Sequence, residues 1–285
     1  MAGRARLDAE LVRRGLARSR RHAGELIEAG RVTVDGVPAS KSATPLTPEH
    51  VVAVAVDPGG EPDYASRAGH KLAGVLDALG PDGPRVAGRT CLDAGASTGG
   101  FTDVLLRRGA AHVVAVDVGH GQLVPSLRAD TRVTVREGVN VRHLVAGDLE
   151  PAPELVVGDL SFISLTIVLP ALVQVAAPGA DLLLLVKPQF EVGRERLGSG
   201  GVVRDPGLRA QAVLDVARSA QALDRRLEAV VASPLPGPSG NVEYVVWLTA
   251  GREPRDDETL EALVRHAVST GPTGEDASWT SGGDR

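Results

Sequence analysis

Short apolar segments alternate with longer segments of helical character along residues 89–248. Seven apolar runs have the length of β-strands, at 89–94, 113–118, 133–136, 155–159, 182–187, 227–232 and 243–248. Three stretches between them, 101–108, 163–177 and 208–223, are long enough for helices. Buried strands that alternate with helices are typical of a parallel sheet covered by helices on both faces. The pattern therefore predicts a doubly wound α/β domain.

The last two predicted strands are joined differently from the others. Only the proline- and glycine-rich residues 233–242 separate them, whereas a crossover between parallel strands needs about a dozen residues or more. The final strand should therefore run antiparallel, which places its first residue, Glu243, at the edge where the other strands end. Residues 256–269 can form a closing amphipathic helix, and the tail at 271–285 has the composition of a disordered segment.

The N-terminal part has a different organisation. Residues 7–14 and 19–29 predict two short helices, with Ser19 as the N-cap of the second and Gly30 at its end. Residues 31–34 predict a strand that turns at Asp35 and Gly36. Residues 58–65 open with the turn formers PGGEP and are expected to be a linker. They would join a small α+β domain at 1–57 to the larger domain at 66–270.

Charge is distributed unevenly between these parts. Residues 1–41 carry nine Lys or Arg against five Asp or Glu, a net charge of +4, so the remainder must carry −9 to give the total of −5. A basic lobe on an acidic body indicates a polyanionic partner, most commonly nucleic acid. A solvated, charged helix face is the alternative interpretation.

Composition argues against several classes of protein. The single cysteine, Cys91, excludes an intramolecular disulfide and is expected in the core of the first strand of the sheet rather than as a nucleophile. The seven histidines show no ligand spacing, so no metal site is expected. The chain opens with charged residues instead of a signal peptide, and its longest apolar stretch, 163–186, is interrupted by proline, glutamine, glycine and aspartate. These features predict a cytoplasmic protein with no membrane partner.

A glycine-rich turn follows the first strand of the sheet and enters a helix. Glycines allow a ligand to approach the backbone, and a helix N-terminus offers free N–H groups. The spacing is not the G-x-G-x-x-G of dinucleotide folds. Asp117 ends the next strand, about 20 residues further on, where an acid can bind ribose hydroxyls. This combination favours S-adenosylmethionine over NAD, with a purely structural turn as the alternative. The candidate cofactor contacts in and around the turn are Asp93, Gly95, Ser97, Thr98, Gly99, Gly100 and Phe101.

Lysine is scarce, and two of the three lysines fall beside motifs. The chain has 31 Lys and Arg residues, of which only Lys41, Lys71 and Lys187 are lysines. An arginine keeps its proton in a protein, whereas a buried lysine can release it. Lys187 and Asp159 end two strands at the same edge as Glu243, and Lys71 is expected to open the helix before the sheet. Each alone is compatible with a surface ion pair, but four such charges together indicate an active site.

Two sets of residues resemble known families. Residues 19–36, SRRHAGELIEAGRVTVDG, resemble the S4 domain, a small RNA-binding module in which arginines of the second helix lie against phosphates. Over residues 6–249 the chain resembles the TlyA proteins, although its linker is longer and richer in Pro and Gly than the connector of that family. The motifs that carry this resemblance are SRAGHKL at 66–72, LDAGASTGGF at 92–101, DVGHGQL at 117–123, DLSFIS at 159–164, KPQFE at 187–191 and PLPGPSGNVE at 234–243.

The TlyA resemblance implies an S4 domain followed by a Rossmann-like, S-adenosylmethionine-dependent methyltransferase domain of the FtsJ type, with an antiparallel last strand. It implies a catalytic tetrad of Lys71, Asp159, Lys187 and Glu243, with Asp159 also at the cofactor. The implied reaction is 2'-O-methylation of cytidine in 16S or 23S rRNA, within 30S or 50S subunits, which the family links to susceptibility to capreomycin-type antibiotics. The side chains expected to contact RNA are Arg6, Arg18, Arg20, Arg21, Lys41 and Arg67.

In the implied reaction a ribose 2'-hydroxyl attacks the methyl group in line, so a base must take its proton. Lys187 is the candidate base; orienting the hydroxyl and stabilising negative charge is an alternative that the sequence leaves open. Because aromatic residues make up only 2% of the chain, an extended base-stacking platform is not expected.

Two other classes of function also remain open, as does the oligomeric state. One is a non-catalytic S4-type RNA-binding or ribosome assembly factor, which would not need the four charged residues. The other is a membrane-lytic haemolysin, after the label of some relatives, which would need an amphipathic or spanning segment.

Overall fold

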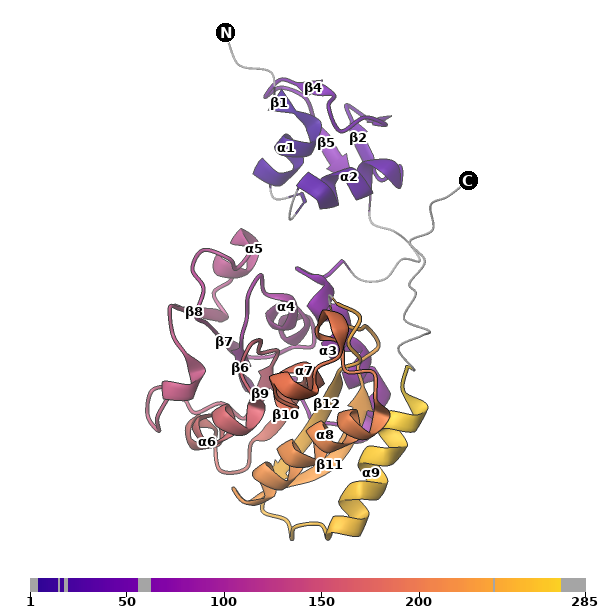
Figure 1. Cartoon of the computed structure of the whole chain (residues 1–285). Coiled ribbons are helices and arrows are strands. Elements are labelled where there is room, and N and C mark those ends of the chain that lie inside the picture. Colours follow the sequence, from indigo (N-terminus) through magenta and orange to yellow (C-terminus); the bar gives the residue numbers. More distant parts are fainter. Residues whose placement is uncertain (1–4, 15, 18–19, 56–62, 238, 273–285) are drawn as a thin grey trace. The chain divides into compact units, whose positions relative to one another are not determined.

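The computed structural model describes residues 5–14, 16–17, 20–55, 63–237 and 239–272, except for the side chains of Arg21, Arg194 and Ser199. Two compact units make up the chain (Figure 1): Met1–Ala65 with Val124–Ser126, and Ser66–Leu123 with Leu127–Arg285. The expected N-cap at Ser19, most of the expected linker and the tail beyond residue 272 lie outside the described residues.

The N-terminal unit contains two helices and five short strands, with a core of its own. Its elements are β1 (Ala5–Arg6), α1 (Leu7–Arg13), α2 (Arg20–Glu28), β2 (Val32–Val34), β3 (Val37–Pro38), β4 (Pro45–Leu46) and β5 (Val52–Val54). Strand β1 pairs with β4, and β2 lies between β3 and β5 in an antiparallel sheet. The core of this unit is made only of residues between Leu7 and Val54. The two expected helices and the strand at β2 are therefore present.

Residues 66–272 contain the strands and helices that the sequence predicts, together with two four-residue helices, at 125–128 and 188–191, that it does not. In chain order they are α3 (Arg67–Leu79), β6 (Thr90–Ala94), α4 (Gly100–Arg107), β7 (His112–Asp117), α5 (Pro125–Arg128), β8 (Val133–Glu137), β9 (Leu155–Gly158), α6 (Leu165–Val175), β10 (Asp181–Val186), α7 (Pro188–Glu191), α8 (Pro206–Gln221), β11 (Arg225–Ala232), β12 (Tyr244–Ala250) and α9 (Asp257–Thr270). The position expected for Lys71 was wrong: α3 begins at Arg67, so Lys71 lies in its second turn. None of the helices in the described ranges is both long and apolar enough to cross a membrane.

Seven strands form one sheet in the order β11-β12-β10-β9-β6-β7-β8. The pairs formed by β6 to β10 are parallel, whereas β12 runs antiparallel to both β10 and β11. The expected antiparallel last strand is confirmed. Glu243 directly precedes β12, so it lies at the edge where the parallel strands end.

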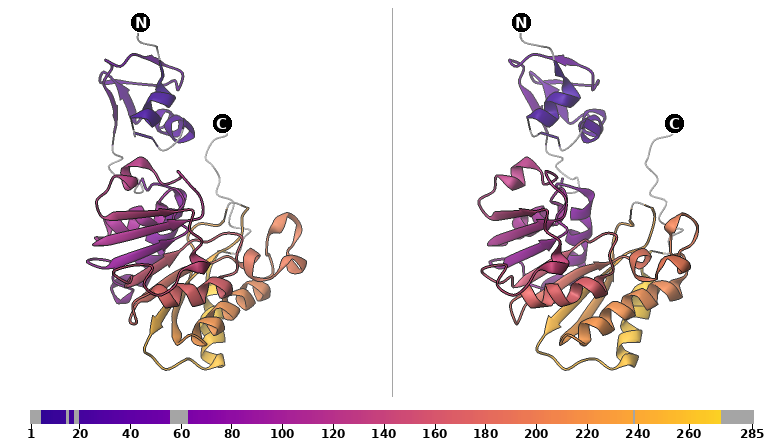
Figure 2. Two further views of the ribbon diagram at one scale, coloured as in Figure 1. Left: turned by 90° about the vertical axis from the view of Figure 1, so that its left-hand side faces the viewer. Right: turned by 60° about the vertical axis from the view of Figure 1, so that its left-hand side comes forward.

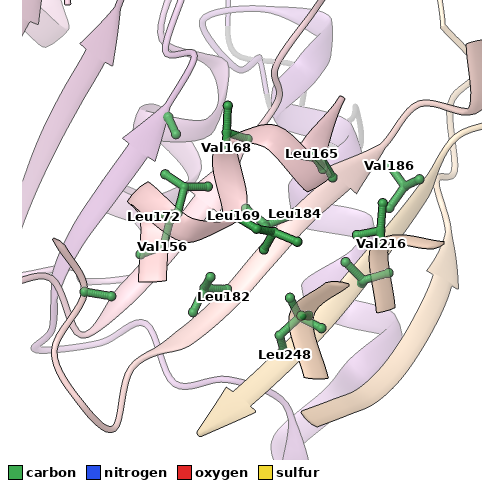
Figure 3. Packing of buried hydrophobic residues seen from close by; sticks show 14 of the residues in the cluster. Val156, Leu165, Val168, Leu169, Leu172, Leu182, Leu184, Val186, Val216 and Leu248 are labelled. Atoms are coloured by element: carbon green, nitrogen blue, oxygen red, sulfur yellow. The ribbon is translucent and has the colours of Figure 1, made fainter. Parts of the chain in front are cut away.

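Helices cover both faces of this sheet (Figure 2). Leu182, Leu184 and Val186 alternate along β10 and share one core cluster with α6 and α8, as Figure 3 shows for Leu169 and Val216. Asp93, between the two residues of β6 that join this cluster, faces the other way and contacts Thr102 of α4. Because successive side chains of a strand point to opposite faces, α4 lies across the sheet from α6 and α8. The strand ends are thereby held between two packed layers.

Candidate active site

Two buried ion pairs lie at the edge where the parallel strands end. Lys71 Nζ donates to Glu243 Oε2 at 2.5 Å, and Lys187 Nζ lies 2.6 Å from Asp159 Oδ1. The lysine side chains are only 7% and 9% exposed, and a buried charge is costly unless it is paired. Lys71, Asp159 and Lys187 line one cavity of about 300 Å³, and Glu243 joins it through Lys71. The structure thus brings together the four residues predicted as a tetrad.

Lys187 is held by two neighbours. It donates a hydrogen bond of 2.8 Å to Ser161 Oγ. Its contact with Asp159 is an ion contact without hydrogen-bond geometry, so Oδ1 of Asp159 still has its acceptor capacity. An ammonium group has three N–H donors. Ser161 uses only one of these positions, so the nitrogen can also contact a substrate oxygen at the wall of the cavity.

The segment before β12 is folded tightly around Glu243. Ser233 N donates to the backbone oxygen of Glu243 at 2.8 Å, and Arg67 donates to Pro236 O at 2.9 Å. A Cβ on Gly237 would lie 2.6 Å from Glu243 Oε1, so only glycine fits there without displacing the carboxylate. The glycine and prolines of this segment therefore position Glu243 against Lys71 on α3.

A second, larger cavity of about 550 Å³ adjoins the first, and the two share Gly95, Ser97, Asp159 and Ser161. Asp117 at the end of β7 lines it and accepts from Ser97 N at 2.8 Å and from Gly119 N at 2.7 Å. Each carboxylate oxygen has a further lone pair for a ligand hydroxyl. The rest of the lining is largely apolar, with Val118, Val139, Val141, Leu160 and Ile163. An acid beside an apolar wall suits a nucleoside, whose sugar is polar and whose base is flat.

The predicted cofactor residues separate into two groups. Gly95 and Ser97 line both cavities, and Gly100 and Phe101 line the smaller one. Within the described part of the chain, Asp93, Thr98 and Gly99 line neither of these two cavities.

Asp93 is fully buried and has a structural contact instead. Its Oδ2 accepts from Thr102 Oγ1 at 2.6 Å, which joins β6 to α4. Burial raises the pKa of Asp93 to about 7. Cys91 is also buried in β6, and desolvation raises its pKa to about 12. The thiol is therefore protonated at neutral pH, in agreement with the expected core position.

Two loops that carry site residues are joined by contacts that local sequence patterns do not reveal. The ring centroids of Phe162 and Phe190 lie 5.2 Å apart. Glu191 accepts from Ser164 Oγ at 2.5 Å and from Leu165 N at 2.9 Å, so it caps the start of α6. Desolvation raises the pKa of Glu191. These contacts fix the loop after Asp159 to α7, the short helix that follows Lys187.

Phe162 is the functional candidate that sequence reasoning missed most clearly. Its side chain is 90% exposed and lines the larger cavity, and its φ of 64° lies in the left-handed region that non-glycine residues avoid. Such backbone strain concentrates at functional sites. One feature of the sequence could have pointed to it. Phenylalanine is rare in this chain, and two of its three phenylalanines, Phe162 and Phe190, closely follow Asp159 and Lys187.

The predicted RNA-contacting residues are in varied surroundings. Arg6 and Arg20 pair with Asp8, Lys41 is exposed, and Arg67 lines the smaller cavity. Arg18 and the side chain of Arg21 lie outside the described residues.

Comparison with known proteins identifies both units. The FtsJ-like methyltransferase family matches residues 64–250, and the S4 domain family matches residues 5–52. A Mycobacterium tuberculosis protein, "16S/23S rRNA (cytidine-2'-O)-methyltransferase TlyA", is 58% identical over 95% of this chain and all of its own length. "Hemolysin A" of Brachyspira hyodysenteriae is 38% identical over 84% of this chain and 98% of its own. A solved structure, "Putative hemolysin from Streptococcus thermophilus", is 34% identical with a TM-score of 0.67, covering 94% of this chain and 97% of the other. The chain therefore belongs to the TlyA family, in which it combines an S4 domain with an FtsJ-like methyltransferase domain.

Proposed function

We propose that the chain is an S-adenosylmethionine-dependent methyltransferase that modifies the ribose 2'-hydroxyl of cytidine in 16S rRNA, 23S rRNA or both. The observation that carries the proposal is the pair of buried lysine–carboxylate contacts beside a cavity that opens into a second, nucleoside-sized one. The name of the Mycobacterium tuberculosis relative supports the choice of cytidine and of ribosomal RNA. An rRNA substrate also implies action in the cytoplasm.

The residues around the larger cavity fit the cofactor that the family implies. Asp117 would accept from the ribose hydroxyls, and the apolar wall that includes Val139 and Leu160 would contact the adenine. Gly95 and Ser97 would lie at the methionine part, where the two cavities meet. The bound cofactor supplies an electrophilic methyl group on a sulfonium. Asp93 does not contact it in this proposal but holds the turn in place through Thr102.

Lys187 is the residue that handles the target hydroxyl. Ser161 and Asp159 fix its Nζ at the cavity wall, which leaves one position on the nitrogen for the 2'-oxygen. There Lys187, in its uncharged amine form, would accept a hydrogen bond from the hydroxyl, hold it in line and take its proton as the oxygen–carbon bond forms, and Asp159 would stabilise the resulting ammonium. Lys71, fixed by Glu243, adds positive charge beside the developing negative charge.

The S4 unit would bind the phosphate backbone of the RNA, and one aromatic side chain beside the cavity would contact a nucleobase. The S4 unit supplies arginines for phosphates, which gives affinity with little dependence on base sequence. Phe162 exposes its ring next to the cavity and offers a stacking surface for one nucleobase, which is far smaller than a single-strand platform.

Methylation of purified subunits tests this function. Separate 30S and 50S particles from cells that lack the modification would be incubated with the protein and labelled S-adenosylmethionine, and the 2'-O-methyl positions mapped in each rRNA. We expect label on the ribose of cytidine in at least one particle. Label on a base, or no label on either rRNA while the cofactor binds, would contradict the proposal.

Two alternatives have their own tests. A ribosome assembly factor would bind the particles and the cofactor without methyl transfer in the same assay. The haemolysin names of two similar proteins favour a membrane-lytic activity, which dye release from phospholipid vesicles measures directly. Release at protein concentrations that suffice for methylation would support that second activity.

A further inference from the structure

We propose that Asp8 holds Arg6 and Arg20 together as a phosphate clamp, so that this negative charge strengthens RNA binding by the N-terminal unit. The inference rests on the proposed function, because it assigns part of the RNA-binding surface. It also predicts a change in RNA affinity opposite to the one expected from net charge alone. Neutralising Asp8 makes the unit more basic, yet we expect it to bind RNA less tightly.

One buried carboxylate joins two arginines from different elements. Asp8 is 5% exposed. Arg6, from β1, donates from Nε to Oδ1 at 3.0 Å and from Nη2 to Oδ2 at 3.1 Å. Arg20, the first residue of α2, donates from Nη2 to the same Oδ2 at 2.9 Å. The two Nη2 atoms are therefore within about 6 Å of each other, the combined length of these two bonds, so one phosphate can reach both guanidinium groups.

The carboxylate that holds the pair is itself anchored. Asp8 N donates to Ser42 O at 3.0 Å, and Oδ1 accepts from Ala9 N at 2.8 Å. The hydrogen bond from Arg6 is the main cause that lowers the pKa of Asp8, so the group is charged at any physiological pH. Asp8 is thus a fixed negative point around which the two arginines are oriented.

The arginines face outward from this point. Their side chains are 52% and 60% exposed. A guanidinium has five N–H donors, and Asp8 occupies only the Nε and Nη2 edge of each. The remaining donors suit the oxygens of a phosphodiester, which accepts charge-assisted hydrogen bonds from arginine. Since both side chains are already ordered, less conformational freedom is lost when RNA binds.

A neighbouring cluster on the same helix provides a matched control. Glu10 is also buried and also pairs with two arginines, Arg13 and Arg14. Arg14, however, is only 21% exposed and donates to His50 O at 2.8 Å, so it is tied into the unit. Glu10→Gln removes the same charge as Asp8→Asn without releasing two exposed arginines.

The test measures binding of the full chain to purified 30S and 50S subunits. We expect Asp8→Asn to weaken binding by roughly three- to tenfold, the effect of releasing one or two ordered side chains, whereas Glu10→Gln leaves it unchanged or tightens it. The double variant Arg6→Lys/Arg20→Lys keeps the charge and changes only exposed side chains. It should also weaken binding, because lysine lacks the planar set of N–H donors with which a guanidinium binds two oxygens at once. In an Arg6→Ala/Arg20→Ala background, Asp8→Asn should have no further effect.

Three outcomes would overturn the clamp: Asp8→Asn binding as tightly as the wild type or more tightly, an equal loss in the background without the two arginines, or full affinity of the lysine double variant. Melting temperatures of the variants separate lost binding from lost folding. Methyl transfer by the wild type on the same particles tests the proposed function separately. If the wild type binds the particles but transfers no methyl group, the proposed function is refuted. The binding data of the variants then decide, by themselves, whether the clamp exists.

Discussion

At the scale of single residues, the distinction between lysine and arginine becomes a test of chemistry. Lys187→Arg keeps the positive charge but brings a larger, planar group that cannot take a proton. We expect methyl transfer to fall by about 100-fold or more, with cofactor affinity close to that of the wild type. Single-turnover transfer to 30S and 50S particles and calorimetry with S-adenosylmethionine measure the two effects. A Lys187→Arg enzyme that transfers methyl groups as fast as the wild type would refute the assignment of Lys187.

Asp117 accepts hydrogen bonds from two backbone N–H groups and, in the proposed site, from the ribose hydroxyls of the cofactor. One substitution affects both roles. Asp117→Asn keeps one acceptor but turns an NH₂ group toward a backbone N–H of Ser97 or Gly119. The amide also offers one acceptor oxygen fewer, and an uncharged one, to the ribose hydroxyls; losing a hydrogen bond to a charged group costs about 1.5–3 kcal/mol, so we expect cofactor affinity to fall by roughly 10- to 150-fold. Asp130→Asn, at a partly buried acid that is paired with Arg132 and lies outside both cavities, should leave it unchanged. Equal affinities for the two variants in calorimetry would exclude Asp117 from the cofactor site.

At the scale of elements, the Asp93–Thr102 contact joins β6 to α4 and makes the free energy of unfolding depend on pH. The carboxyl has a pKa of about 7 in the folded chain, above its unfolded value of ~4. Protonation therefore stabilises the fold fully below pH ~4, and this contribution is lost as the pH rises to 7, by ~1.4 kcal/mol for each pH unit. Asp93→Asn removes this dependence and keeps an acceptor for Thr102. Denaturant unfolding at pH 5 and pH 7 should show the variant gaining stability over the wild type at the higher pH; parallel changes in both proteins would contradict it.

The elements also show what the sequence could predict and what it could not. The strands of the large sheet and the antiparallel β12 follow from apolar periodicity and from the length of one connection, both of which are local features. The placement of Asp159, Lys187 and Glu243 at one edge was predictable because strand ends meet there, whereas the contact of Lys71 with Glu243, 172 positions apart, depends on how α3 packs and was not predicted as a pair. The roles of Ser161 and Glu191 were not predictable, because they depend on how two loops pack against each other, and no periodicity encodes that packing.

At the scale of the whole molecule, each unit has a core of its own. The core of the N-terminal unit lies within residues 7–54, whereas the sheet and its helices bury residues from α3 onward, such as Leu72 and Val75. Among the residues that the structure describes, none from the N-terminal unit lines either of the two cavities. The proposed cofactor site therefore lies outside the N-terminal unit, which carries most of the arginines expected to contact RNA, so cofactor binding should survive deletion of that unit.

Removal of residues 1–56 tests that separation. Because the cavity residues all remain, we expect cofactor affinity within about twofold of the wild type, and thermal unfolding still shifted upward by S-adenosylmethionine as binding to the folded state requires. Methyl transfer to 30S and 50S particles should be lost, because the arginines of the S4 unit that we propose to bind phosphates are gone. At low salt, where electrostatic binding is strongest, the wild type should bind far better than the truncated chain, and this advantage should shrink as salt is added. Undiminished rRNA methylation by the truncated chain would show that RNA recognition lies in the methyltransferase unit instead.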